Sequence, residues 1–124
     1  MSVVLASIAA VIAVIWGIAH LIPTRNVVAG FGKLSKDNRL VITQEWIAEG
    51  ISLIFLGILV GVVTAIGRVT NPVVATVYGL AAAMLLIMAA LTALTGARGS
   101  IVFFKICPLV KTTAAVLLLA SMIL

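Results

Sequence analysis

The sequence predicts an all-α fold, an antiparallel four-helix transmembrane bundle that forms a single domain over residues 1–124. Hydrophobic residues make up 65% of the chain and charged residues only 9%, whereas soluble proteins carry about a quarter charged residues. The mean hydropathy is +1.41. Apolar runs long enough to span a bilayer as helices take up most of the chain. We expect four helices, at about residues 3–22, 43–66, 72–95 and 101–124.

The first predicted helix, 3–22, ends before Pro23 because proline disfavours the helical conformation of the residue that precedes it. Its small residues share one face with His20, and we expect that face to point into the bundle; they are Ala6, Ala9, Ala13 and Gly17. Residues 24–41 are predicted to form a loop. Its apolar residues have the spacing of a short interfacial helix, which Gly30 and Gly32 disfavour.

Glycines mark one face of the second predicted helix, 43–66, namely Gly50, Gly57 and Gly61. Gly57 and Gly61 form a GxxxG element, which in an apolar helix indicates a close helix crossing. We expect these three glycines and Gly17 to pack helices together. A crossing within the bundle is favoured over one between copies of the chain.

The boundaries of the last two helices follow from glycine, asparagine and proline. Gly67 suits the end of the second helix, and Asn71 followed by Pro72 reads as an N-cap and first helical position. Gly96 ends the third helix. Pro108 would clash with the carbonyl of Phe104, so the last helix is expected either to kink there or to begin near Cys107.

The positive charges predict the orientation of the chain. The first and third loops, with the start of the last helix, carry seven cations, and the opposite side carries only Arg68. The seven are Arg25, Lys33, Lys36, Arg39, Arg98, Lys105 and Lys111. Because an excess of Lys and Arg marks cytoplasmic loops, we expect loops 23–42 and 96–100 to face the cytoplasm and both termini to face outward from the inner cell membrane. The net charge of +5 therefore indicates topology and not nucleic-acid binding.

The predicted bundle brings most of its polar side chains to the cytoplasmic half. His20 ends the first helix, Glu45 and Glu49 begin the second, and Lys111 lies in the last. Ionisable groups at membrane depth cost roughly 2.5–3.5 kcal/mol each on insertion scales, so they usually face inward and pair. We predict that Lys111 meets Glu49 or Glu45, with His20 in the same cluster.

This polar cluster has two interpretations. In the structural one, the charged side chains pair or extend to the lipid headgroups, and His20 binds a backbone carbonyl. In the functional one, the cluster is a proton relay or a polar anchor for a lipophilic ligand.

Other reactive side chains give weaker signals. Cys107 is the only cysteine, which excludes an intrachain disulfide and a CxxC site, so we expect it to be a small buried residue. Met84 and Met88 with Cys107 and His20 could be imagined as a soft-metal site, but methionines at this spacing indicate core packing. We predict no metal site, cofactor or catalytic residue.

Four short segments give the chain a resemblance to a known family. They are His20 to Pro23, Gly30 to Leu34, the Glu45-Trp-Ile-Ala-Glu-Gly50 opening of the second helix, and Phe104-Lys-Ile-Cys-Pro108. The layout resembles the small four-helix bacterial membrane proteins of the DoxX-like type. Some members are associated with quinone-linked redox chemistry, so the resemblance implies a quinone as one candidate ligand. It assigns no functional residue to this chain.

Three functions remain open. The first is a non-enzymatic accessory or scaffold subunit of a membrane assembly, which would bind other membrane subunits or itself within the bilayer. The second is a binder of a lipophilic ligand or quinone, with or without enzymatic activity, with His20, Glu45, Glu49 and Lys111 lining the site. The third is a small proton-coupled transporter. An apolar pocket against the glutamates favours the second, and a filled core with a flat glycine-rich outer face favours the first.

Overall fold

The computed structural model describes residues 1–67 and 70–124, and in that part of the chain every regular element is helical. The elements are α1 (Val3–Leu21), α2 (Thr24–Gly30), α3 (Lys36–Ile66), α4 (Pro72–Leu94), the 3₁₀ turn η1 (Gly96–Arg98) and α5 (Val102–Ile123). The four long helices have the length and apolar composition to cross a membrane. The chain is therefore a small polytopic membrane protein. Arg68, which the orientation argument used, lies outside the described residues.

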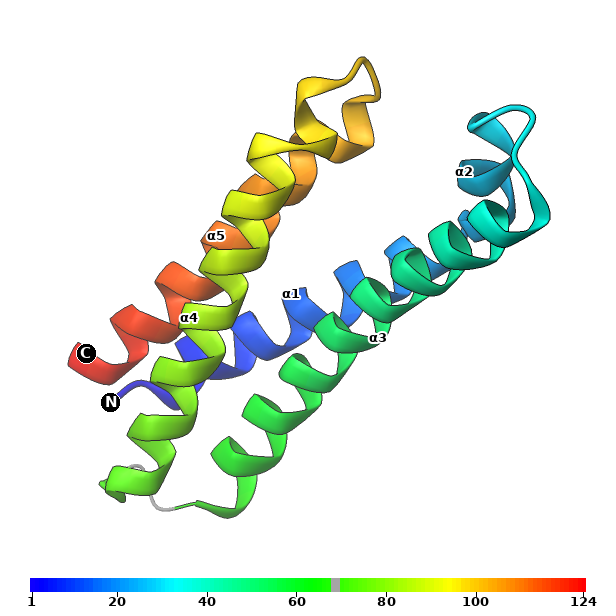
Figure 1. The fold of residues 1–124 in the computed structure, drawn as a ribbon. Helices are drawn as coiled ribbons and strands as arrows, with labels where there is room; N and C mark the ends of the chain where they lie inside the picture. The colour runs from blue at the N-terminus through cyan, green and yellow to red at the C-terminus, as the bar shows by residue number, and fades with distance from the viewer. Residues whose placement is uncertain (68–69) are drawn as a thin grey trace.

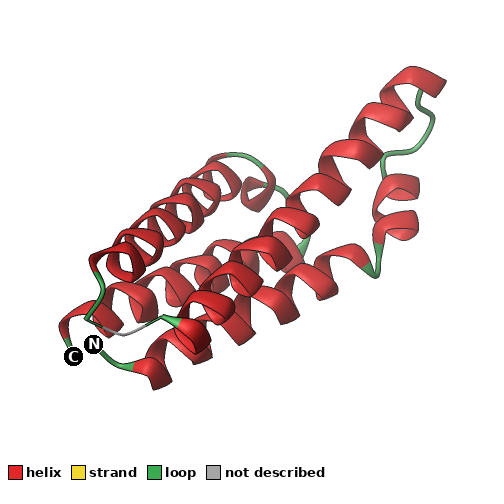
Figure 2. Ribbon diagram, turned by 90° about the horizontal axis from the view of Figure 1, so that it is seen from below, coloured by secondary structure: helices red, strands yellow, loops and turns green. Residues whose placement is uncertain are grey.

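The long helices form two pairs. α1 packs along α3 and α4 packs along α5, and the pairs meet mainly where α1 contacts α5. The two termini lie together, and the backbone amide of Ser2 donates to the carbonyl of Ser121 at 2.7 Å. α2 and η1 lie at the opposite end, where the two pairs diverge (Figures 1 and 2). The molecule thus has a closed end at the termini and an open end at α2 and η1.

The predicted start of the second long helix at residue 43 was wrong, and the short helix that the apolar spacing within residues 24–41 suggested does form. α3 begins at Lys36, about two turns before the predicted start, because the Ser35 hydroxyl caps it by accepting from the Asn38 amide at 3.1 Å. Asp37 adds a favourable negative charge in the first turn. The short helix α2 also forms, and Gly32, with φ of 74°, follows its end. The connection between α1 and α3 is therefore largely helical.

The alternative in which the last helix begins near Cys107 was also wrong, since α5 spans Val102–Ile123 with Pro108 inside it. Packing of the first turns explains this. Phe103 stacks on Trp16 with ring centroids 4.8 Å apart, and Cys107 is buried. These contacts hold the segment before Pro108 in place although proline removes one helical hydrogen bond.

Small residues fill the closed half of the core. Alanines from α1, α4 and α5 are buried there, and they allow the helix backbones to approach closely; they are Ala6, Ala9, Ala10, Ala81, Ala82, Ala114 and Ala115. The Thr64 and Tyr78 hydroxyls share a buried hydrogen bond of 2.6 Å that joins α3 to α4. Large apolar side chains such as Ile15, Phe55 and Leu109 point outward, as a lipid-facing surface requires.

Three of the four predicted packing glycines lie where α1 crosses α3. A Cβ atom on Gly57 would lie 2.6 Å from the Ala10 carbonyl oxygen, and one on Gly17 would lie 2.8 Å from the Gly50 carbonyl oxygen. Gly61 differs, because a Cβ atom there would meet only the Ala10 Cβ, at 3.9 Å. The close approach of the two helices therefore depends on Gly17, Gly50 and Gly57, inside one chain.

Substitution of Gly57 by alanine should destabilise the α1–α3 pair, because the new methyl group meets backbone atoms that cannot move aside cheaply. Overpacking of this kind costs about 1–3 kcal/mol. The measurement is the free energy of unfolding in detergent. Gly61→Ala is the matched control, since the same methyl group finds ordinary contact distance there. Equal stability of the two variants would contradict the close crossing.

Candidate functional site

A buried lysine links three helices at the open half of the molecule. Lys111 of α5 is 1% exposed, and its Nζ donates to the Glu49 carboxylate of α3 and to the Thr92 hydroxyl of α4, the latter at 2.9 Å. The Thr92 hydroxyl donates its own proton to the Met88 carbonyl, which leaves its oxygen free to accept from Lys111. The Glu49 side chain is 30% exposed, so one side of the ion pair is closed and the other is accessible.

His20 lies on the closed side of this ion pair. The imidazole is 1% exposed and stacks on the Trp46 ring with centroids 3.8 Å apart. Its Nε2 lies 3.7 Å from Glu49 Oε2, too far for a hydrogen bond. Among the described residues, neither imidazole nitrogen has a hydrogen-bond partner. The structure therefore places His20, Glu49 and Lys111 together and leaves the hydrogen bonding of His20 incomplete.

Aromatic side chains form the wall behind the ion pair. Trp46 Nε1 donates to the His20 carbonyl at 2.9 Å, which satisfies a carbonyl in the last turn of α1. Trp16 Nε1 lies 3.3 Å from the Cys107 sulfur and donates to it. Phe104 meets the Trp46 ring edge-on, at 5.4 Å between centroids. Sequence reasoning missed this wall, although the proximity of aromatic residues 16, 46, 103 and 104 to the polar residues was a usable signal.

The fourth predicted cluster residue, Glu45, lies apart from the ion pair. It is exposed and lines a cleft of about 430 Å³ between α3 and α4, as Glu49 does. We call this the α3–α4 cleft. Its lining also includes Ala48, Ser52, Met84, Met88, Leu91, Thr92, Thr95, Gly96 and Phe104. In the part of the chain that the structure describes, no salt bridge involves Glu45.

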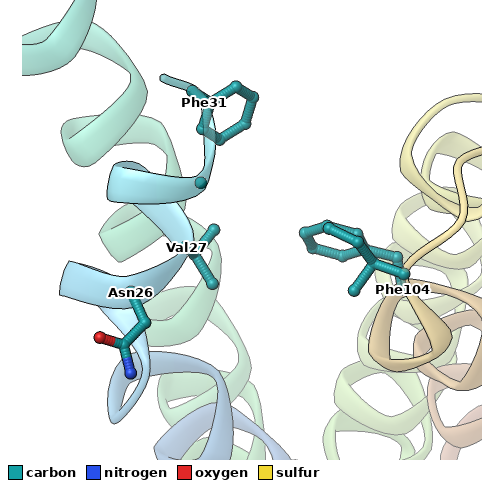
Figure 3. A pocket seen from close by; sticks show the side chains of 6 residues that line it. Asn26, Val27, Phe31 and Phe104 are labelled. Carbon is teal, nitrogen blue, oxygen red and sulfur yellow. The ribbon is translucent and has the colours of Figure 1, made fainter. Parts of the chain in front are cut away.

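Two further hollows adjoin the cleft at the open end. One of about 270 Å³ lies between α2 and the start of α5, where Phe31 and Val27 face Phe104 across the gap (Figure 3). Another, of about 250 Å³, is lined by Phe31, Trp46 and both glutamates. Phe104 lines both the cleft and the first hollow, and Glu45 and Glu49 line both the cleft and the second hollow. The two carboxylates thus lie among mainly apolar side chains at the open end.

The donor types indicate what the site can bind. In residues 1–67 and 70–124, no group of three His, Cys, Asp or Glu side chains is arranged to hold a metal ion. Met84 and Met88 line the cleft, whereas Cys107 is buried and accepts from Trp16. The arrangement combines an apolar cavity with two carboxylates, one of them paired with an ammonium group.

Comparisons with protein-family models, with curated proteins and with solved structures found no match to this chain. The resemblance to DoxX-like proteins therefore stays a prediction.

A double-mutant cycle tests the ion pair. Glu49→Gln leaves the Lys111 ammonium buried without its counter-charge, and breaking a buried pair in this way costs about 3–5 kcal/mol. The double variant with Lys111→Met should lose much less than the sum of the two single losses in unfolding free energy. Glu45→Gln is the control and should change stability little, since Glu45 is exposed. Additive losses from the two single variants would contradict the pair.

Proposed function

We propose that this protein binds a lipophilic molecule that carries a polar head, with the α3–α4 cleft as its site. The observation that carries the proposal is an apolar cleft of about 430 Å³ whose lining includes Glu45, Glu49 and Thr92. Small-molecule sites are concave, mostly apolar and of about 300–1,000 Å³, with a few polar groups that fix orientation. The cleft has this character.

The position of the cleft suits a ligand that arrives from the bilayer. Met84 and Leu91 line it and are largely exposed on the outside of the bundle, at 42% and 63%. The two helix pairs diverge toward the end where α2 and η1 lie (Figure 1). An apolar chain can therefore lie against α4 while its head reaches the carboxylates.

The packing supports binding over the other two functions. Tyr78, Leu85 and Leu118 fill the closed half at about 1% exposure each, so the cleft ends on a packed core and not on a path through the chain. Three of the four glycines that could have formed an interface with another subunit, Gly17, Gly50 and Gly57, are used between α1 and α3 instead. One observation still favours an accessory subunit, namely a shallow groove on the outer face lined by Ala10, Val11, Val14, Gly57 and Gly61.

We test the binding site by filling it. Ala48 is exposed within the cleft, so Ala48→Phe should occupy it without entering the core. Ala65→Phe places the same ring on the exposed surface near the other end of α3. After purification in mild detergent from the native source, mass spectrometry of extracted small molecules should find a lipophile with the unmodified protein and with Ala65→Phe. Its recovery should fall at least about tenfold with Ala48→Phe, the size of a 1.4 kcal/mol loss in binding.

Equal recovery of that lipophile with Ala48→Phe would overturn the proposed site. If no lipophile is found in any sample, and a protein subunit co-purifies with the unmodified protein but not with Ala48→Phe, the accessory-subunit function is favoured instead.

We also infer the orientation in the inner cell membrane from the loop charges, with residues 23–42 and 96–100 cytoplasmic and both termini outward. Alkaline phosphatase fused after Leu124 should be active in a bacterial host, because it folds only outside the cytoplasm. A green fluorescent protein fused there should be dark when exported in unfolded form. The reverse pair of results would place the termini and the open end on the opposite sides.

A further inference from the structure

The side-chain hydroxyls of the α3–α4 cleft have no proton to offer a ligand. Ser52 donates to the Ala48 carbonyl at 2.7 Å, Thr92 to Met88 at 2.9 Å and Thr95 to Leu91 at 2.6 Å. A hydroxyl has one proton to donate and two lone pairs that accept. These three groups therefore face the cleft as acceptors.

The charged side chains also make the cleft a site that accepts hydrogen bonds. Glu45 and Glu49 line it, and its described lining includes no cationic side chain. Lys111 is buried behind Glu49 and directs its ammonium group to Glu49 and Thr92. With both acids ionised, the single ammonium balances one carboxylate and leaves the other uncompensated. An uncompensated charge beside hydrocarbon is costly, so a cation in the cleft would be stabilised.

His20 lies behind Glu49, outside the lining of the cleft. Its imidazole is 1% exposed, and its Nε2 is aimed at Glu49 Oε2 from 3.7 Å. Within the described residues, both of its nitrogens are without a hydrogen-bond partner. His20 therefore adds no hydrogen-bond donor to the described lining of the cleft.

We propose that the cleft selects a lipophile with a cationic, hydrogen-bond-donating head, of which a protonated long-chain amine is the simplest form. This inference rests on the proposed function and names its ligand class. The ammonium head would pair with Glu45 and Glu49, and the Phe104 ring and the methionine sulfurs would contact the head and chain. A head that only accepts hydrogen bonds, such as the carbonyl pair of a quinone, would find no free side-chain donor in the described lining of the cleft.

The test compares heads on a constant chain. Decylamine, 2-decanone and decanoate present a donating cation, a neutral acceptor and an anion. Equilibrium dialysis of each labelled compound against protein in zwitterionic nanodiscs, corrected with empty nanodiscs, gives binding beyond partition into lipid. Decylamine should bind at least about tenfold more tightly than 2-decanone, and decanoate should bind most weakly.

Three variants assign the selectivity to the carboxylates. Glu45→Gln should reduce the preference for decylamine over 2-decanone, and because Glu45 is exposed, this variant should fold. Glu49→Gln should reduce the preference further where it folds. Asp37→Asn is the matched control, since Asp37 is the third acid of the chain and lies in the first turn of α3, outside the cleft lining.

The outcomes separate the two proposals. If decylamine and 2-decanone bind equally and Ala48→Phe abolishes both, the cleft is a lipophile site and the ligand class is wrong. If an unchanged preference persists in Glu45→Gln and Glu49→Gln, the two carboxylates do not recognise the head, and the proposed basis of selection in this cleft is wrong. If none of the compounds binds beyond empty nanodiscs, or if Ala48→Phe leaves binding intact, the proposed function fails and the ligand class fails with it.

Discussion

The contact between Lys111 and Glu49 decides how the two helix pairs meet at the open end. An ammonium group 1% exposed in a membrane helix requires a counter-charge, and the carboxylate comes from the other pair. α3 and α4 otherwise contact each other little. The bond from Lys111 to Thr92 fixes α4 as well. One side chain therefore links α3, α4 and α5 beside the cleft.

The two halves of the bundle differ because their side chains differ in size. Alanines at the closed end allow α1, α4 and α5 to pack backbone against backbone. Toward the open end, aromatic rings lie between the pairs, with Trp16 against Phe103 and Trp46 against Phe104. Rings of this size hold helices further apart than alanines do. The cleft thus forms where aromatic side chains replace alanines between the two helix pairs, and the Lys111–Glu49 ion pair closes its inner side.

Hydropathy located the four long helices well, and it failed where boundaries depend on polar residues. The predicted start of α3 was wrong because Ser35 and Asp37 stabilise the first turn of the helix, one by capping and the other by its charge. Hydropathy does not detect either effect. The cost of burying charge was enough to predict that Lys111 meets Glu49 or Glu45, without deciding between them. The separation of Glu45 from that pair and the stacking of His20 on Trp46 depend on packing between distant segments. No local pattern in the sequence encodes those contacts.

The acceptor character of the cleft follows from the helical fold itself. A serine or threonine in a regular helix can donate to the carbonyl four residues earlier, and in lipid no water competes for that proton. Ser52 and Thr92 do so within their helices, and Thr95, which follows the end of α4, donates to Leu91 in the same way. Lys111 could have supplied donors, but its ammonium group is engaged with Glu49 and Thr92 in the contact that joins the helix pairs. The interaction that stabilises the fold therefore also leaves the site open to a donor from outside.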